Sequence, residues 1–320
     1  MLTRTLCRMT TQEETTAAAD TVERPSSPGI VLALAGVLWM AAMLWSARAT
    51  ITGRADAAME VTSSAYALPG AISASLVAGA AVALAVLAAA GRGGRTFGAT
   101  LRFAIATGAG LVLGLLGAVS IITINTDGWV YAVVGGTVAA AATIGGALAG
   151  FRAPRVVAAV CWAAIAVFVV GFVLNYLQSP LLDLFGSGSS SASQASAANW
   201  FSLTQAILSG LAAGLVAYRT LRRARRQSDS TDVRWPLYAL AGAGPGLLLV
   251  LAEGLARTAG ARVLELAGKV SELELIVQRM LSSSRLNSAL IVLFVGAISA
   301  IIAVGRTMTP APDNEPALED

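Results

Sequence analysis

The sequence predicts an all-α integral membrane protein, built as a bundle of about eight transmembrane helices. Charged residues make up only 12% of the 320 residues and hydrophobic residues 56%, whereas soluble domains carry roughly 25% charged residues. Eight apolar runs each approach the roughly 20 residues that a helix needs to cross a bilayer. Runs this long without alternation are helices, because only helices and closed barrels satisfy every backbone group in lipid. The eight runs are residues 29–45, 68–90, 103–124, 129–150, 156–177, 201–218, 236–256 and 288–305.

The predicted transmembrane domain spans residues 29–305 and lies between two predicted disordered cytoplasmic tails, 1–28 and 306–320. Residues 1–28 are rich in Thr, Ala, Glu and Ser and show no apolar periodicity, which is the composition of a disordered segment. The triplet Ala-Arg-Ala at 47–49 follows the first run and resembles a signal-peptidase site. We expect a retained first span, since no positive cluster adjoins the run; a cleaved signal peptide is the alternative.

The placement of arginines predicts the orientation of the bundle. Arg-rich loops alternate with the loops at 125–128 and 178–199, which contain no Lys or Arg. By the positive-inside rule, the Arg-rich side and both termini are cytoplasmic; the segment 257–286, with five basic residues outside, is the exception. The Arg and Ala bias is typical of a GC-rich bacterial genome, so we expect a multi-pass protein of the bacterial inner (cell) membrane. The arginines of the cytoplasmic loops are Arg92, Arg95, Arg102, Arg152, Arg155, Arg219, Arg222, Arg223, Arg225 and Arg226.

Two outer segments have distinct compositions. The loop 186–198, GSGSSSASQASAA, is predicted to be a flexible linker. The segment 259–286 is amphipathic, with apolar residues at spacings of three and four that match a short dimeric coiled-coil seam. These apolar residues are Val263, Leu266, Val270, Leu273, Val277 and Met280.

An upright helix over this amphipathic segment conflicts with the chain length, because the few residues that remain before the last span cannot return over the same distance. We therefore predict that the segment lies along the outer surface as an interfacial helix between the seventh and eighth spans. There it binds a protein partner or a second copy of the chain through 262–281, or only caps the bundle.

Small residues predict how the helices pack. Pairs of glycines four residues apart occur in four of the predicted helices. Since lipid provides little hydrophobic drive between helices, close backbone approach at such pairs holds a bundle together. The pairs are Gly110 and Gly114, Gly146 and Gly150, Gly210 and Gly214, and Gly242 and Gly246.

The helix predicted at 236–256 carries the candidate solute or coupling site, which consists of Gly244, Pro245, Gly246, Glu253 and Arg257. Pro245 lacks an N–H and predicts a kink, and the glycines beside it predict an unwound turn. Several transporters bind substrate at such a break; the alternative is a static kink that shapes packing.

Glu253 is the only acidic residue inside a hydrophobic run, and an intramembrane carboxylate is a functional candidate by default. Arg257 lies four residues on, so an ion pair on one helix face is a structural alternative. Polar residues at other helix ends are expected to share an outer vestibule with Glu253, but they form no recognisable site. They are Asn125, Asn175, Gln205 and Asn287.

Several function classes are disfavoured by composition. The chain has no His, which is the commonest general base and metal ligand, and we expect neither a cofactor nor a metal. The net charge of +4 and the lack of basic stretches with aromatics argue against nucleic acid. We expect a non-enzymatic protein in contact with membrane lipids. A transporter or permease-like subunit, moving a small solute or lipid through a cavity near the helix break, is the first interpretation. A membrane scaffold or accessory subunit, binding a partner through 262–281, is the second.

Overall fold

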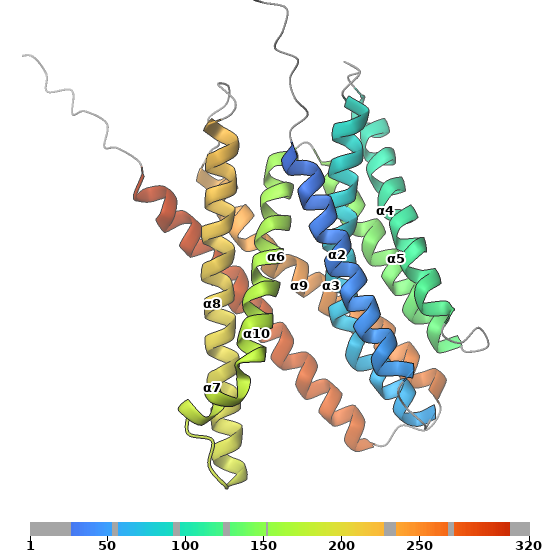
Figure 1. The fold of residues 1–320 in the computed structure, drawn as a ribbon, viewed down its shortest axis with the longest axis vertical. Coiled ribbons are helices and arrows are strands. Elements are labelled where there is room, and N and C mark those ends of the chain that lie inside the picture. Colours follow the sequence, from blue (N-terminus) through green and yellow to red (C-terminus); the bar gives the residue numbers. More distant parts are fainter. Residues whose placement is uncertain are drawn as a thin grey trace, which may run out of the picture.

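The computed structural model describes residues 27–52, 57–91, 97–123, 129–151, 153–226, 235–267 and 272–307. Within these residues the chain is helical and forms no strand (Figure 1). The helices are α2 (Ser27–Thr52), α3 (Ala57–Gly91), α4 (Ala99–Ile122), α5 (Trp129–Gly150), α6 (Pro154–Tyr176), α7 (Gln178–Leu184), α8 (Ser191–Arg226), α9 (Trp235–Ala267) and α10 (Glu272–Gly305).

All of these helices except the short α7 are long and apolar enough to cross a membrane, which makes eight spans in the described part of the chain. The prediction of an all-α bundle with about eight spans is therefore confirmed. Residues 1–26 and 308–320 lie outside the described residues, so the predicted disorder of the two tails stays a prediction.

The eight long helices of the described chain run in alternating directions between two ends of the bundle (Figure 1). At one end, here called the arginine-rich end, α4 and α6 begin while α5, α8 and α10 finish. There Arg102 donates from Nη2 to the carbonyl oxygen of Phe151 over 2.9 Å, which ties α4 to the end of α5. Arg222 donates to the Tyr218 hydroxyl over 2.7 Å. The other end is called the α7 end, because α7 lies there between α6 and α8.

Helix α9 joins the two halves of the bundle. One half is built from α2, α3, α4 and α5, and the other from α6, α8 and α10; α9 contacts α3 and α5 on one side and α6, α8 and α10 on the other. Its buried side chains belong to all three apolar clusters of the described chain. Ala252 packs in the cluster around Ile72, Leu248 in the cluster around Val77, and Tyr238 in the cluster around Leu221.

Glycines allow the helices to touch backbone to backbone, as the small-residue pairs predict. A Cβ on Gly110 would meet the backbone of Ala142 and Gly146 in α5. In the other half, Gly242 of α9 lies against the backbone of Gly296 in α10, where a side chain would have no room. Each of the eight predicted glycines is in such a contact with a neighbouring helix, so the predicted role in packing is confirmed.

The predicted linker at 186–198 is wrong for most of its length, because α8 already begins at Ser191. Only the residues before it form a turn, in which Gly186 has a positive φ of 82°. The Oγ of Ser190 accepts a hydrogen bond from the backbone N–H of Ser193 over 3.2 Å, which is how a serine caps a helix N-terminus. Ala197 is then fully buried. The Ser-rich composition of 186–198 predicts a linker and gives no weight to Ser190 as the cap of a helix.

The amphipathic segment 259–286 also differs from the prediction of one interfacial helix. Its first part continues α9 to Ala267, and its last part belongs to α10, which begins at Glu272. The segment thus runs outward on one helix and returns on the next, which resolves the chain-length conflict without a helix lying flat. The side chains of most of the proposed seam at 262–281 lie outside the described residues, so its role in binding a partner stays untested.

Two glycines of α4 provide a matched test of the close packing. Gly110→Ala should lower the free energy of unfolding by about 1–3 kcal/mol, because the added methyl has no room against α5. Gly108 has no heavy atom within 4 Å of a built Cβ, so Gly108→Ala should leave stability unchanged or slightly raised. Unfolding in detergent, followed by heating or by SDS titration, measures both. Equal midpoints for the two variants would contradict the packing account.

Candidate functional site

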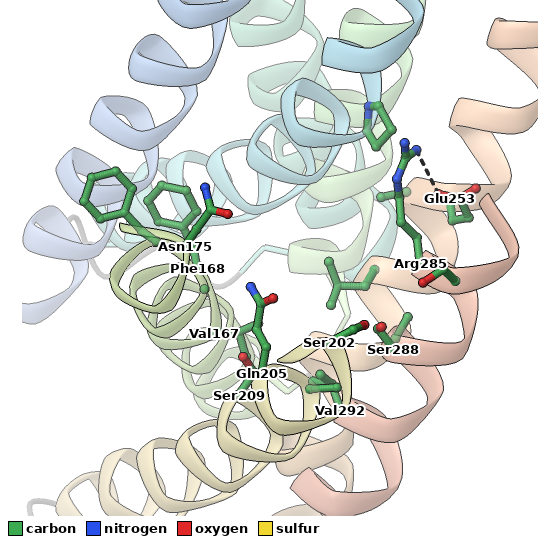
Figure 2. A pocket seen from close by; sticks show the side chains of 18 of the residues that line it. Val167, Phe168, Asn175, Ser202, Gln205, Ser209, Glu253, Arg285, Ser288 and Val292 are labelled. Carbon is green, nitrogen blue, oxygen red and sulfur yellow. Dashed lines mark ion pairs between the residues drawn. The ribbon is translucent and has the colours of Figure 1, made fainter. Parts of the chain in front are cut away.

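A cavity of about 550 Å³ lies between the two halves of the bundle, toward the α7 end (Figure 2). This volume falls within the roughly 300–1,000 Å³ of typical ligand pockets. Six helices supply its wall. The lining residues are Met43 of α2; Pro69 of α3; Val167, Phe168, Gly171, Phe172 and Asn175 of α6; Ser202, Gln205, Ala206 and Ser209 of α8; Leu249, Ala252 and Glu253 of α9; and Ser284, Arg285, Ser288, Ala289 and Val292 of α10.

The wall of this cavity is amphipathic. Phe168 and Phe172 of α6 and Val292 of α10 supply apolar surface, whereas Gln205 of α8 and Arg285 of α10 supply hydrogen-bonding groups. Figure 2 labels all of these except Phe172. Hydrogen-bonding side chains are uncommon inside an apolar bundle, and here they gather on the wall of one cavity. The Phe168 ring stacks on the ring of Trp39 in α2, with ring centroids 4.7 Å apart. The arrangement suits a ligand that has both polar and apolar parts.

Glu253 is the charged centre of the site. Its side chain is only 5% exposed, although burying a carboxylate without partners is costly. The Ser282 hydroxyl of α10 donates to Oε1 of Glu253, and Arg257 Nε lies 3.5 Å from the same oxygen. Arg285 Nη1 lies 3.8 Å from the other oxygen, Oε2. Two guanidinium groups and one hydroxyl therefore surround one buried carboxylate.

The partners of Glu253 are linked to one another. The Nε of Arg257 donates to the Ser282 hydroxyl over 2.6 Å, a shorter distance than its 3.5 Å approach to Glu253. The chain of donors thus runs from Arg257 through Ser282 to the carboxylate. Because Ser282 lies on α10 and Glu253 on α9, this network fastens the two helices together near the α7 end. A network of this kind can stabilise a fold by more than the sum of its separate hydrogen bonds.

The structure brings only part of the predicted site together. Glu253 and Arg257 form the predicted i,i+4 pair, but Arg257 is not part of the cavity wall. Gly244, Pro245 and Gly246 are not on the wall either: Gly246 packs against Leu293 of α10, and Gly244 packs against Val160 of α6. The cavity meets α9 farther along, from Leu249 to Glu253.

The expected unwound turn at Pro245 is absent, because α9 is helical from Trp235 to Ala267. Pro245 is fully buried within this helix. Transmembrane helices tolerate proline where neighbouring helices compensate for the missing hydrogen bond. The cavity therefore does not depend on broken backbone, and its polar groups are side chains instead.

Sequence reasoning missed Ser282 and Arg285, two of the three partners of Glu253. The signal for them is a polar stripe of Ser282, Arg285 and Ser288, which recurs every three residues and so follows one face of α10. Of the polar residues expected to face an outer vestibule, Asn175 and Gln205 do line the cavity. The described part of the wall does not include Asn287, and Asn125 lies outside the described residues.

A second hollow, of about 700 Å³, lies between α2 and α4 and is lined mainly by apolar side chains, with Arg48 and Ser120 as its polar lining residues. Met40, Leu44 and Leu113 are among its lining residues, and Arg48 donates to the carbonyl oxygen of Ser120 over 3.2 Å beside it. Such a hollow is typical of the lipid-facing surface of a helical bundle. It brings few polar groups together, and we therefore do not treat it as the candidate site.

The outward surface of the bundle defines the class of the protein. Large apolar side chains such as Leu38, Leu116 and Phe294 are more than half exposed, which is unfavourable in water and typical of helices in lipid. The chain is thus a multi-pass helical membrane protein. Comparison with protein families, curated proteins and solved structures found no match to this chain. Among the residues described, no three acidic or cysteine side chains gather as metal ligands would.

The geometry predicts unequal effects of removing members of the charged cluster. Glu253→Gln should cost about 2 kcal/mol of unfolding free energy, because it leaves two guanidinium groups without their carboxylate. This is below the roughly 3–5 kcal/mol of a fully buried pair, since Arg257 and Arg285 are 48% and 36% exposed. Arg285→Gln should cost less, because Glu253 keeps Arg257 and Ser282.

A double-mutant cycle on unfolding in detergent checks this prediction. The double variant Glu253→Gln with Arg285→Gln should lose less stability than the sum of the two single losses, as expected for directly coupled residues. Strictly additive losses, or a larger loss for Arg285→Gln than for Glu253→Gln, would show that the carboxylate is not the centre of the cluster.

Proposed function

We propose that this chain is a transporter or permease-like protein that moves a small solute or lipid through the cavity between its two halves. One observation carries the proposal: a buried carboxylate and a guanidinium line a cavity of about 550 Å³ inside an otherwise apolar bundle. Charged groups within membrane helices are expensive and commonly mark a substrate or ion pathway.

The arrangement of the two halves also supports transport. Secondary transporters commonly place the substrate between two parts that rock against each other. In this chain α9 contacts both halves, and the cavity lies between Met43 and Pro69 of one half and the α6, α8 and α10 residues of the other. We propose that a motion of one half relative to the other, with α9 between them, opens and closes the cavity.

The proposed orientation follows from the positive-inside rule. Arg102, Arg155 and the arginines at the end of α8 lie at the arginine-rich end, so we propose that this end, and with it both termini, faces the cytoplasm of a bacterial cell. The cavity then opens toward the outside of the inner membrane. Arg257 and Arg285 lie toward the α7 end, where each is paired with Glu253.

A scaffold or accessory subunit is the second candidate function. The observation in its favour is the start of α10, where Ile276 is 49% exposed and precedes the apolar span that begins at Arg279. Met280 is 69% exposed one turn later. An apolar surface at the edge of the span could bind a protein partner or a second copy of the chain through 262–281.

Co-purification tests the transport proposal before the substrate is known. The full-length chain would be purified in mild detergent, and retained small molecules and lipids would be identified by mass spectrometry. The wild type should carry a bound compound, and Ser202→Trp should lose it, because Ser202 lies on the cavity wall. Leu203→Trp is the matched control: Leu203 is the next residue on α8, is 37% exposed, and is not among the lining residues.

The same compound should cross the membrane of vesicles that contain the wild type or Leu203→Trp, and should not cross with Ser202→Trp. Retention and flux that are equal in the two variants would contradict the transport proposal. A stoichiometric protein partner with no cavity-dependent compound would favour the scaffold instead.

A further inference from the structure

We propose that the ligand of this cavity is an amphiphile with an anionic head, a carboxylate or a phosphate ester. Its head would bind at Arg285, and its apolar part would lie against Phe168, Phe172 and Val292. The inference rests on the transport function proposed above and names the substrate class for that site.

The charge of the cluster favours an anion. The described cavity wall contains one acidic residue, Glu253, and one basic residue, Arg285. Arg257 lies behind Glu253 and contacts the same carboxylate. One negative charge is therefore shared between two positive charges, and the cluster keeps a net charge of +1. Because the surrounding helices form a wall of low dielectric constant, this charge attracts an anion more strongly than it would in bulk solvent.

The hydrogen bonding of the cluster points to Arg285 as the anchor. Glu253 already accepts from Ser282 and Arg257. Arg285 lies 3.8 Å from the carboxylate, which is longer than a hydrogen bond, and its side chain is 36% exposed. A guanidinium has five N–H donors in a planar fork that matches carboxylate and phosphate oxygens. Arg285 is thus held in place by charge while its hydrogen-bonding capacity stays open to a ligand.

A cationic ligand fits this wall less well. Its natural partner would be Glu253, whose side chain is 5% exposed and is already engaged by three groups. The cation would also meet Arg285 at close range and be repelled. An anion meets the opposite situation, because it is attracted by the Arg285 guanidinium on the cavity wall.

The rest of the wall indicates an amphiphile rather than a small inorganic anion. Apolar and polar side chains are interspersed on the wall: Phe168 lies near Asn175 of the same helix, and Val292 lies one turn from Ser288 on α10 (Figure 2). Phe172 is a further apolar lining residue. Gln205 and Ser288 supply further donors within the same cavity. A ligand with a charged head and a hydrocarbon part can use both kinds of surface.

The experiment uses four probes that share one hydrocarbon chain: dodecanoate, dodecyl phosphate, dodecanol and dodecylammonium. Binding would be measured by titration of the full-length protein in nanodiscs of zwitterionic lipid. Wild type should bind the two anions at least about tenfold more tightly than the alcohol or the amine, since hydrogen bonds to charged groups contribute at this level. Whichever of the two anions binds more tightly then indicates the source of the head group: dodecanoate indicates a fatty acid, and dodecyl phosphate indicates a lipid phosphate.

Three variants assign the binding to the cavity and to Arg285. Arg285→Gln should weaken both anions about tenfold or more, and Arg285→Lys should recover part of the affinity because it keeps the charge without the fork. Arg279→Gln is the matched control, since Arg279 is exposed on the same helix and is not among the lining residues. Ser202→Trp should abolish binding of every probe.

Each other outcome overturns the proposal in a recognisable way. Tighter binding of the amine or the alcohol, still abolished by Ser202→Trp, contradicts the anionic class and leaves the cavity as a transport site. Binding that is insensitive to Ser202→Trp, or no binding of any probe, contradicts the proposed ligand class. Flux of the co-purified compound then decides separately whether transport survives. If Arg285→Gln does not fold, the anchor is still tested by comparing how tightly Arg285→Lys and Arg279→Gln bind the two anions.

Discussion

The partnering of the Glu253 carboxylate is the constraint on which the α7 end of this bundle depends. A carboxylate inside an apolar bundle is costly unless charges and hydrogen bonds compensate it. Arg257 can do so from the same helix, but Ser282 and Arg285 are available only if α10 returns alongside α9 in one register. The cluster thereby helps to fix the register of the hairpin between the last two spans. It also places a guanidinium on the cavity wall.

Glycine contacts set the rest of the architecture. Gly110 and Gly146 hold α4 and α5 at backbone distance, and Gly214 of α8 lies in the same way against the backbone of Gly296 in α10. Each half of the bundle is therefore closely packed around small residues, and van der Waals contact substitutes for the hydrophobic drive that lipid does not provide. Between the halves, near the α7 end, the cavity wall carries the polar side chains of Gln205 and Arg285 beside small residues such as Ala206. Long polar side chains do not pack into a closed apolar seam, and a cavity results.

The features that the sequence could predict are those that depend on local pattern. Apolar length identified the eight spans, glycine spacing identified the helix contacts, and the spacing of Glu253 and Arg257 identified their pair. Arg285 was missed because it meets Glu253 only through the fold, 32 positions away in the chain. Composition cannot predict the register in which α10 packs against α9.

The errors have the same origin. The stretch after Ser190 reads as a linker by composition, but one serine side chain caps α8 and the alanines that follow continue the helix. Pro245 reads as a break, but packing on both sides keeps α9 helical through it. In both places a specific contact outweighed an average tendency of the residue type. The same limit applies to function, since no local motif marks a cavity that six helices build together.

The most direct test of the account is whether water reaches the cavity. In a chain without its two native cysteines, Cys7 and Cys161, a single cysteine would be placed on α8 and treated with a membrane-impermeant maleimide from the α7 side. Cysteines at Ser202 and Gln205, which line the cavity, should react, because a thiol needs water to form its reactive thiolate. Cysteines at Leu203 and Ile207, which are exposed but not on the cavity wall, should react slowly. Equally slow reaction at all four positions would contradict a hydrated cavity around Glu253.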